Sequence, residues 1–206
     1  MARLIISFLE ALELEDVTLV GNDSGGALSQ FLIDTDSTRI GRLVLTNCDA
    51  FDKFPPPPFD QIFKLGRHAG VLKGLLAPMR ATRLRHSPLG YGMLVREPLD
   101  AVLTRRWVEP CLSDAGVLRD TVAFLKGVDK RQLLDVSTRL HQFDKPVLLL
   151  WGDGDRFFKL DFARRLGRVF PDARLVEIPG RPDLPPPRRA RARGHRDRKR
   201  VCCRSG

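Results

Sequence analysis

The fold of this chain is decided by the stretch VTLVGNDSGGAL, residues 17–28. It passes from an apolar, β-branched segment through a glycine-bracketed turn into the start of a helical pattern. A strand that turns abruptly into a helix strains the residue at the turn, so the positions two before and two after it have to be small. Gly21 and Gly25 meet that requirement around Asp23. The spacing therefore predicts Asp23 as a nucleophile at the end of a strand.

The neighbours of Asp23 fit the same chemistry. The backbone N–H of Ser24 and the helix N-terminus behind it would face the reacting group and stabilise negative charge there. In a second interpretation Ser24 is itself the nucleophile, with Asn22 and Gly26 at the small positions, although Asn22 suits that position less well than Gly21. In a third, the stretch is an ordinary strand-to-helix turn with no catalytic role.

Strands and helices alternate on both sides of this stretch, which is the pattern of an α/β fold with a parallel sheet. Near-continuous apolar runs predict buried strands, and amphipathic spacing predicts helices. The expected strands are 17–21, 42–46, 146–151 and 174–178, and the expected flanking helices are 2–14, 26–33 and 160–169.

A long insertion separates the second and third strands. Pro55–Pro58 cannot continue a strand or a helix, so we expect a stiff extended connector and a hinge there. From Asp60 to about His141 only helical patterns follow, at 61–65, 71–76, 99–108, 117–125 and 131–140. A block of helices inserted between strands predicts a lid over 52–144.

The charge of the chain is concentrated at one end. The net charge is +10, but residues 181–206 hold most of it, in an arginine-rich tail without apolar periodicity. Such a tail is expected to be disordered. A protein that binds nucleic acid or another anion through this tail is an alternative function, but nucleic-acid binding is disfavoured because the tail lacks interleaved aromatic residues and the body is nearly neutral.

Composition excludes several further classes. Cys48, Cys111, Cys202 and Cys203 have no C-x-x-C spacing, so no metal site, cofactor or disulfide framework is expected. No apolar stretch is long enough to cross a membrane, and no cleavable leader is apparent at the N-terminus. We expect a cytoplasmic protein that acts on a small organic molecule; no pattern specifies an oligomeric state.

Taken in order, these pieces resemble the α/β-hydrolase superfamily, in its branch with an aspartate nucleophile, the haloalkane dehalogenases and epoxide hydrolases. The resemblance rests on VGNDSGG at 20–26, RIGRLVLTN at 39–47, the proline-rich entry to a helical block, and KPVLLLWGDGD at 145–155. It implies a partial hydrolase fold with core segments 1–51 and 145–180, an inserted lid at 52–144, and the basic tail 181–206.

The resemblance also implies further site residues. The acid that orients the catalytic histidine commonly lies in a W-G-x-x-D turn, which nominates Asp155, with Asp153 as its neighbouring alternative and Asp49 as a weaker one. Lid tyrosines that activate an epoxide oxygen are a family feature, and Tyr91 is the only tyrosine. The family's histidine follows its last strand; here only His195, deep in the tail, lies downstream.

These departures shape the expected activity. The resemblance implies that Asp23 attacks a substrate carbon to form an ester, which a histidine-activated water then cleaves. Without that histidine the chain is expected to be inactive or to stop after a single turnover. Dehalogenases of this branch usually have a tryptophan after the nucleophile, where this chain has Ser24. We also expect an incomplete copy, with a late start and an out-of-frame tail; a serine-type esterase using Ser24 is the alternative enzyme.

Overall fold

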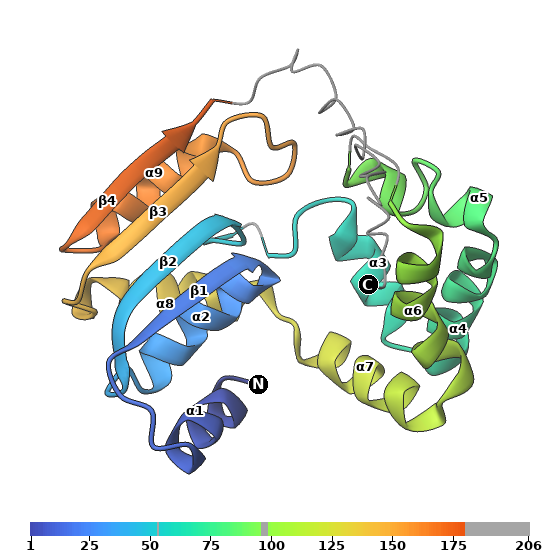
Figure 1. The fold of residues 1–206 in the computed structure, drawn as a ribbon, viewed down its shortest axis with the longest axis horizontal. Helices are drawn as coiled ribbons and strands as arrows, with labels where there is room; N and C mark the ends of the chain where they lie inside the picture. Colours follow the sequence, from blue (N-terminus) through green and yellow to red (C-terminus); the bar gives the residue numbers. More distant parts are fainter. Residues whose placement is uncertain (53, 96–98, 180–206) are drawn as a thin grey trace, which may run out of the picture.

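The computed structural model describes residues 1–52, 54–95 and 99–179. A four-stranded sheet and its helices form one part of the molecule, and a block of helices forms the other (Figure 1). The strands are β1 (Val17–Asp23), β2 (Ile40–Cys48), β3 (Val147–Gly152) and β4 (Ala173–Ile178). The α-helices are α1 (Ala2–Ala11), α2 (Ser24–Thr35), α3 (Phe59–Gly66), α4 (Ala69–Leu76), α5 (Thr82–Arg85), α6 (Ala101–Ser113), α7 (Ala115–Gly127), α8 (Lys130–Ser137) and α9 (Leu160–Val169). The short 3₁₀ helices are η1 (Ala77–Arg80), η2 (Tyr91–Met93) and η3 (Leu140–Gln142).

The sheet is parallel throughout, in the order β1-β2-β3-β4. Its strands come from the apolar runs of the sequence, because β-branched and leucine side chains pack well on a pleated surface. The carboxyl ends of all four strands therefore lie at one edge of the sheet, where α/β folds build their sites. The α/β class expected from the sequence is confirmed.

The helices α2 and α9 cover one face of the sheet (Figure 1). On that side the core is fully buried, as at Leu45, Leu149 and Trp151. The alternate positions of β3 are only half-buried, because no described helix covers the opposite face of this strand. In the described part of the chain, the expected burial of this strand is therefore complete on one face only.

The junction of β1 and α2 and the proline run differ from the sequence expectation. β1 continues to Asp23, because Asn22 still pairs with Thr46 on β2. The helix α2 starts at Ser24 instead of Gly26, since the strand passes into the helix without an intervening loop. The proline run is not extended: the N–H of Phe59 donates to the carbonyl of Pro56 at 2.9 Å and closes a turn.

The helices α3 to α7 form a separate layer with their own small core, centred on Leu72, Val122 and Leu125. The last helix of the expected lid, α8, packs on α2 instead. Its Leu133 belongs to a small apolar cluster with Ala27 and Phe54, and Val136 of the same helix belongs to the core under the sheet. The lid over 52–144 stays a prediction, and α8 lies outside the separate helical layer. No described helix is long and apolar enough to cross a membrane.

Candidate functional site at the strand ends

Asp23 lies at the junction of β1 and α2, in a strained backbone conformation. Its φ is 53° and its ψ is −131°, a backbone region that residues other than glycine rarely occupy. Such a conformation costs of order 1–3 kcal/mol and persists only where the surrounding structure enforces it. The turn over 21–26, hereafter the elbow, therefore holds Asp23 in a position that the local sequence alone would not favour.

The glycines of the elbow contribute unequally. A Cβ at Gly21 would lie 2.6 Å from the Ser29 hydroxyl and 2.8 Å from the Gly25 carbonyl. A Cβ at Gly26 would lie 2.3 Å from Cys48 Cβ, whereas one at Gly25 would have no atom within 4 Å. The expectation that Gly25 must be small is wrong, because its α-hydrogens point into open space. The second tight position is Gly26, where α2 crosses the end of β2.

The Asp23 carboxylate has one occupied oxygen and one free oxygen. Oδ1 accepts the Ser24 backbone N–H at 2.6 Å and the Ser24 hydroxyl at 3.1 Å. Oδ2 accepts no hydrogen bond from any residue that the structure describes. The carboxylate is exposed, so this second oxygen is available to a reactant.

A cavity of about 630 Å³ opens in front of Asp23. Its floor comes from the ends of β1 and β2 and the loop after β3, and its opposite wall comes from η2 and the residues directly after it. The lining residues are Asn22, Asp23, Asn47, Gly92, Met93, Leu94, Val95, Gly154, Asp155, Arg156, Phe157 and Phe158. A volume of this size matches small-molecule sites.

Two asparagines fix the floor of this cavity. Asn22 donates to the Thr46 hydroxyl at 2.9 Å. Asn47 donates to the Gly152 carbonyl at 3.0 Å and accepts the Gly152 N–H at 2.8 Å, so it ties the end of β2 to that of β3. Sequence reasoning nominated Asn22 but missed Asn47. Asn47 follows an apolar strand directly in the sequence, and this position could have identified it, because the ends of parallel strands meet at one edge of the sheet.

Asp155 lines the cavity, but its carboxylate already has partners. Its Oδ1 accepts the N–H groups of Phe157 at 2.8 Å and Phe158 at 3.0 Å, which shapes the loop after β3. The Trp151 indole donates to the Phe158 carbonyl at 2.7 Å and anchors the same loop. The neighbouring acid Asp153 is exposed and does not line the cavity. In the structure Asp155 therefore acts as a loop cap, and its catalytic role stays a prediction.

None of the described histidines lines the cavity. His86 contacts the Thr104 hydroxyl at 2.8 Å, His141 contacts the Thr138 carbonyl at 2.9 Å, and His68 precedes α4. His195 and the basic tail lie outside the described residues.

The aromatic candidates of the helical layer pack on each other. The Tyr91 ring meets the Trp107 ring edge-on, with centroids 5.4 Å apart, and Tyr91 is not among the residues that line the cavity. Burial raises the pKa of the Tyr91 hydroxyl. The structure therefore does not bring Tyr91 together with Asp23.

Asp49, the remaining candidate, is fully buried beside the elbow. Its backbone N–H donates to the Asp23 carbonyl at 3.3 Å. Burial, reinforced by the negative charge of Asp23, raises the pKa of the Asp49 carboxyl to about 7. The Ser24 hydroxyl acts in the opposite direction and lowers the pKa of Asp49, although it makes no hydrogen bond to either carboxyl oxygen. Two carboxyl groups therefore lie together at the elbow, one exposed and one buried.

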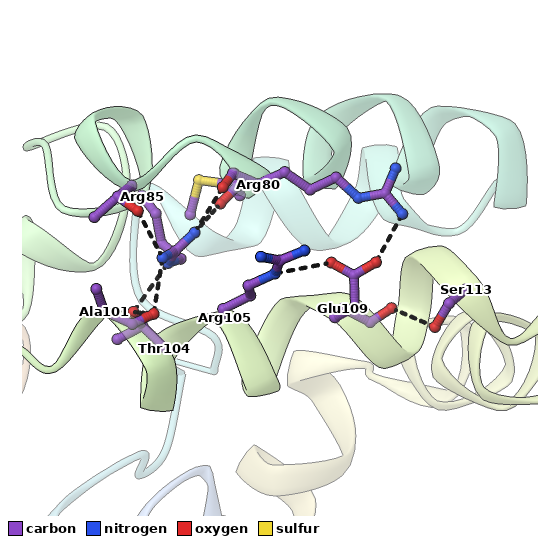
Figure 2. Close-up of polar contacts among 9 residues, drawn as sticks. Arg80, Arg85, Ala101, Thr104, Arg105, Glu109 and Ser113 are labelled. Atoms are coloured by element: carbon purple, nitrogen blue, oxygen red, sulfur yellow. Dashed lines mark hydrogen bonds and ion pairs between the residues drawn. The ribbon is translucent and has the colours of Figure 1, made fainter.

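The helical wall of the cavity is braced by a buried arginine. The Arg85 guanidinium donates to the Thr104 hydroxyl at 2.9 Å, the Ala101 carbonyl at 2.9 Å and the Met79 carbonyl at 2.7 Å, which joins η1, α5 and α6 (Figure 2). Gly92 packs tightly on the segment that follows Arg85, since a Cβ there would lie 2.3 Å from the His86 carbonyl. Arg85 thus fixes the segment that faces Asp23 across the cavity.

The strained turn lies at the carboxyl edge of a parallel sheet and faces a cavity under a helical layer. Comparison with protein families gives a matching result. The family model described as alpha/beta hydrolase fold matches residues 1–183. The chain belongs to this family. In this fold Asp23 lies at the turn between β1 and α2.

Relatives of the chain are hydrolases. A 2-hydroxy-6-oxononadienedioate/2-hydroxy-6-oxononatrienedioate hydrolase from Dechloromonas aromatica is 28% identical over 177 residues, which cover 84% of this chain and 58% of that protein. The chain thus spans little more than half the length of this curated relative.

Solved structures share the fold. An alpha/beta hydrolase fold protein from Burkholderia ambifaria has a TM-score of 0.67 at 22% identity, covering 86% of this chain and 63% of that one. A putative ancestral haloalkane dehalogenase has a TM-score of 0.62 at 20% identity, covering 86% and 65%. At these identities the likeness concerns the fold alone.

Proposed function

We propose that this alpha/beta hydrolase attacks a carbon atom of a small organic substrate through Oδ2 of Asp23. The observation that carries the proposal is the geometry of the elbow: a carboxylate held at φ 53°, facing a cavity, with one oxygen bound and the other free. A carboxylate that attacks carbon forms a covalent ester. Haloalkanes and epoxides are the substrate classes that offer a suitably electrophilic carbon.

The two oxygens of Asp23 would have separate tasks. As Oδ2 bonds to carbon, the carbon–halogen bond or an epoxide carbon–oxygen bond breaks on the opposite side. Oδ1 then becomes the carbonyl oxygen of the ester, still bound to the Ser24 N–H at 2.6 Å. When water attacks that ester, the negative charge develops on Oδ1, where this N–H stabilises it. The strained turn thus prepares both steps.

Hydrolysis of the ester is expected to be the slow step. A histidine would normally activate the water, and none of the described histidines lines the cavity. General-base catalysis contributes about 10²–10⁴-fold, so its loss would leave the ester long-lived. We therefore expect a burst of one equivalent per chain followed by slow turnover.

The serine-type alternative finds less support in the geometry. The Ser24 hydroxyl donates to Asp23 Oδ1 and does not line the 630 Å³ cavity. It lines a different, mostly apolar cavity between α2 and α7. No described histidine accepts its proton.

Intact-mass measurement after incubation with styrene oxide or 1-bromobutane tests the proposal. We expect a single covalent adduct that maps to the peptide containing Asp23 and that Asp23→Asn abolishes, with a loss of at least about 10³-fold in the rate of modification. Asp52→Asn, which alters an acid outside the cavity, is the matched control and should form the adduct at the wild-type rate. A label on Ser24, or an adduct that survives in Asp23→Asn, would contradict the proposal, as would rapid multiple turnover.

A further inference from the structure

The oxygen of Asp23 that does not attack the substrate has two hydrogen-bond donors, and both belong to Ser24. Oδ1 accepts the backbone N–H of Ser24 at 2.6 Å and the Ser24 hydroxyl at 3.1 Å. The proposed attack uses Oδ2, so both hydrogen bonds can persist when the ester forms. The N–H has a role in the proposed reaction, whereas the hydroxyl has none so far.

The hydroxyl of Ser24 is committed to Asp23. It makes no other hydrogen bond to any residue in the described ranges. The neighbouring carboxyl group of Asp49 does not compete for it, because neither oxygen of Asp49 accepts a hydrogen bond there. The donor therefore points to Oδ1 before any substrate is bound.

The position of Ser24 suits a supporting donor. Ser24 is the first residue of α2 and is half-buried. It does not line the 630 Å³ cavity, so it contacts Asp23 without occupying the space that a substrate needs. It lines the cavity of about 950 Å³ between α2 and α7, together with apolar side chains such as Leu28, Phe31 and Phe124. Surroundings of low polarity strengthen a hydrogen bond to a charged oxygen.

The two chemical steps use a donor on Oδ1 in opposite ways. During attack, negative charge leaves the Asp23 carboxylate, so the donor stabilises the starting carboxylate more than the transition state. During hydrolysis, negative charge develops on Oδ1 of a neutral ester, so the same donor stabilises the transition state more than the ester. Only an interaction that is stronger in the transition state accelerates a step. The hydroxyl thus opposes the first step and assists the second.

We propose that the Ser24 hydroxyl is the second oxyanion donor for hydrolysis of the Asp23 ester. This inference rests on the proposed function. A hydroxide ion from solvent bonds to Cγ, and the electron pair of the carbonyl bond moves to Oδ1, which the hydroxyl and the N–H of Ser24 both stabilise. The pair then returns as the bond from Cγ to the substrate oxygen breaks. The departing alkoxide takes the proton of the new carboxylic acid, which restores the Asp23 carboxylate and releases an alcohol. Ser24 keeps its own proton throughout.

The formation and the decay of the styrene oxide adduct, followed separately by intact mass, test this proposal. In Ser24→Ala we expect the adduct to form at least as fast as in the wild type but to decay about 10²-fold more slowly, the effect of losing one oxyanion donor. Ser29→Ala is the matched control, because it removes a hydroxyl of the same helix that donates to the Gly25 carbonyl at 2.8 Å. It should leave both rates unchanged.

A second pair of variants separates the hydroxyl from the shape of the side chain. Ser24→Thr keeps a hydroxyl, whereas Ser24→Val replaces it with a methyl group at nearly the same volume. We expect the adduct to decay at nearly the wild-type rate in Ser24→Thr and slowly in Ser24→Val. This comparison stands even if Ser24→Ala fails to fold. The infrared band of the ester carbonyl should also lie at higher wavenumber in Ser24→Val, because Oδ1 loses a hydrogen bond.

Two results would overturn the inference while leaving the proposed function intact. One is equal decay of the adduct in Ser24→Thr and Ser24→Val. The other is a decay that Ser29→Ala slows as much as Ser24→Ala does, since the effect would then come from the packing of α2. Absence of any adduct in the wild type would instead overturn the proposed function, and this inference with it.

Discussion

The elbow at Asp23 and the loop at Asp155 lie at the same edge of the sheet and line the same cavity, yet only the elbow holds its aspartate at a positive φ. At the elbow, Oδ1 of Asp23 accepts the backbone N–H and the hydroxyl of the next residue, Ser24, and the backbone is strained. In the loop, one oxygen of Asp155 binds two backbone N–H groups and thereby stabilises the local structure. In each carboxylate the second oxygen accepts no hydrogen bond within the described residues, so backbone strain is what distinguishes the elbow, and such strain is typical of reactive groups.

The difference shows that position at a strand end is not sufficient for a catalytic role. Both acids are placed where an α/β fold builds its site. What separates them is the strained backbone at Asp23 and the presence of a second acid, Asp49, beside only one of them. Each of the following predictions tests a part of this difference.

The largest effect on stability is expected from Asp49. Its pKa in the folded chain is about 7, above the ordinary value of 3.8, so between about pH 4 and 7 the folded state keeps a proton that the unfolded state has lost. The free energy of unfolding should therefore fall as the pH rises through that window and be level above it. The slope is at most about 1.4 kcal/mol per pH unit, or about 4 kcal/mol in total.

Urea denaturation of the wild type and of Asp49→Asn from pH 4 to 8 measures how the free energy of unfolding depends on the protonation of Asp49. The variant lacks the titrating group, so the difference between the two curves isolates it from all other acids. We expect the variant to gain stability relative to the wild type as the pH rises. Parallel curves would mean that Asp49 is ionised or accessible in the folded chain, which would remove the distinction between the elbow and the loop.

The packing of the elbow should give the next largest effect. In Gly26→Ala the new Cβ would lie 2.3 Å from Cys48 Cβ and 2.4 Å from its Sγ, so α2 or β2 has to move. Overpacking of this kind costs about 2–3 kcal/mol. Gly25→Ala is the matched control: its Cβ meets nothing within 4 Å, and alanine favours the helix. Thermal denaturation should separate the two variants, and equal destabilisation would contradict the assignment of Gly26 as the tight position.

The sequence alone predicts the framework well. The bounds expected for α9, 160–169, are those observed, because its amphipathic pattern is strong and its flanks are clear. The elbow was predicted from its spacing, but the start of α2 at Ser24 was missed, since two adjacent glycines read as a helix breaker when the tight packing against Cys48 is unknown. Local pattern therefore predicts the elements better than their exact junctions.

The site was predicted less completely, because burial arises from tertiary packing. Asp49 was a minor candidate in the sequence, where nothing marks it as the acid without exposed surface. The bridge from Asn47 to Gly152 joins residues that are far apart in the chain, so no short motif reveals it. Conversely, the W-G-x-x-D turn made Asp155 prominent, although in the structure its oxygen binds its own loop. A sequence motif predicts where a residue lies in the fold, but its burial, hydrogen bonds and charge state depend on the tertiary packing around it.

The smallest effect, and the one that decides the role of the loop, is expected from Asp155. In Asp155→Ala the N–H groups of Phe157 and Phe158 lose their acceptor, which should cost about 1 kcal/mol. Asp155→Asn keeps a side-chain oxygen for both N–H groups and should be close to neutral in stability. If Asp155 is only a cap, both variants form and hydrolyse the Asp23 adduct at nearly the wild-type rate, as measured by intact mass. If Asp155→Asn leaves stability unchanged but slows hydrolysis of the adduct, the charge of Asp155 takes part in the reaction, and the loop then has the catalytic role that the resemblance implies.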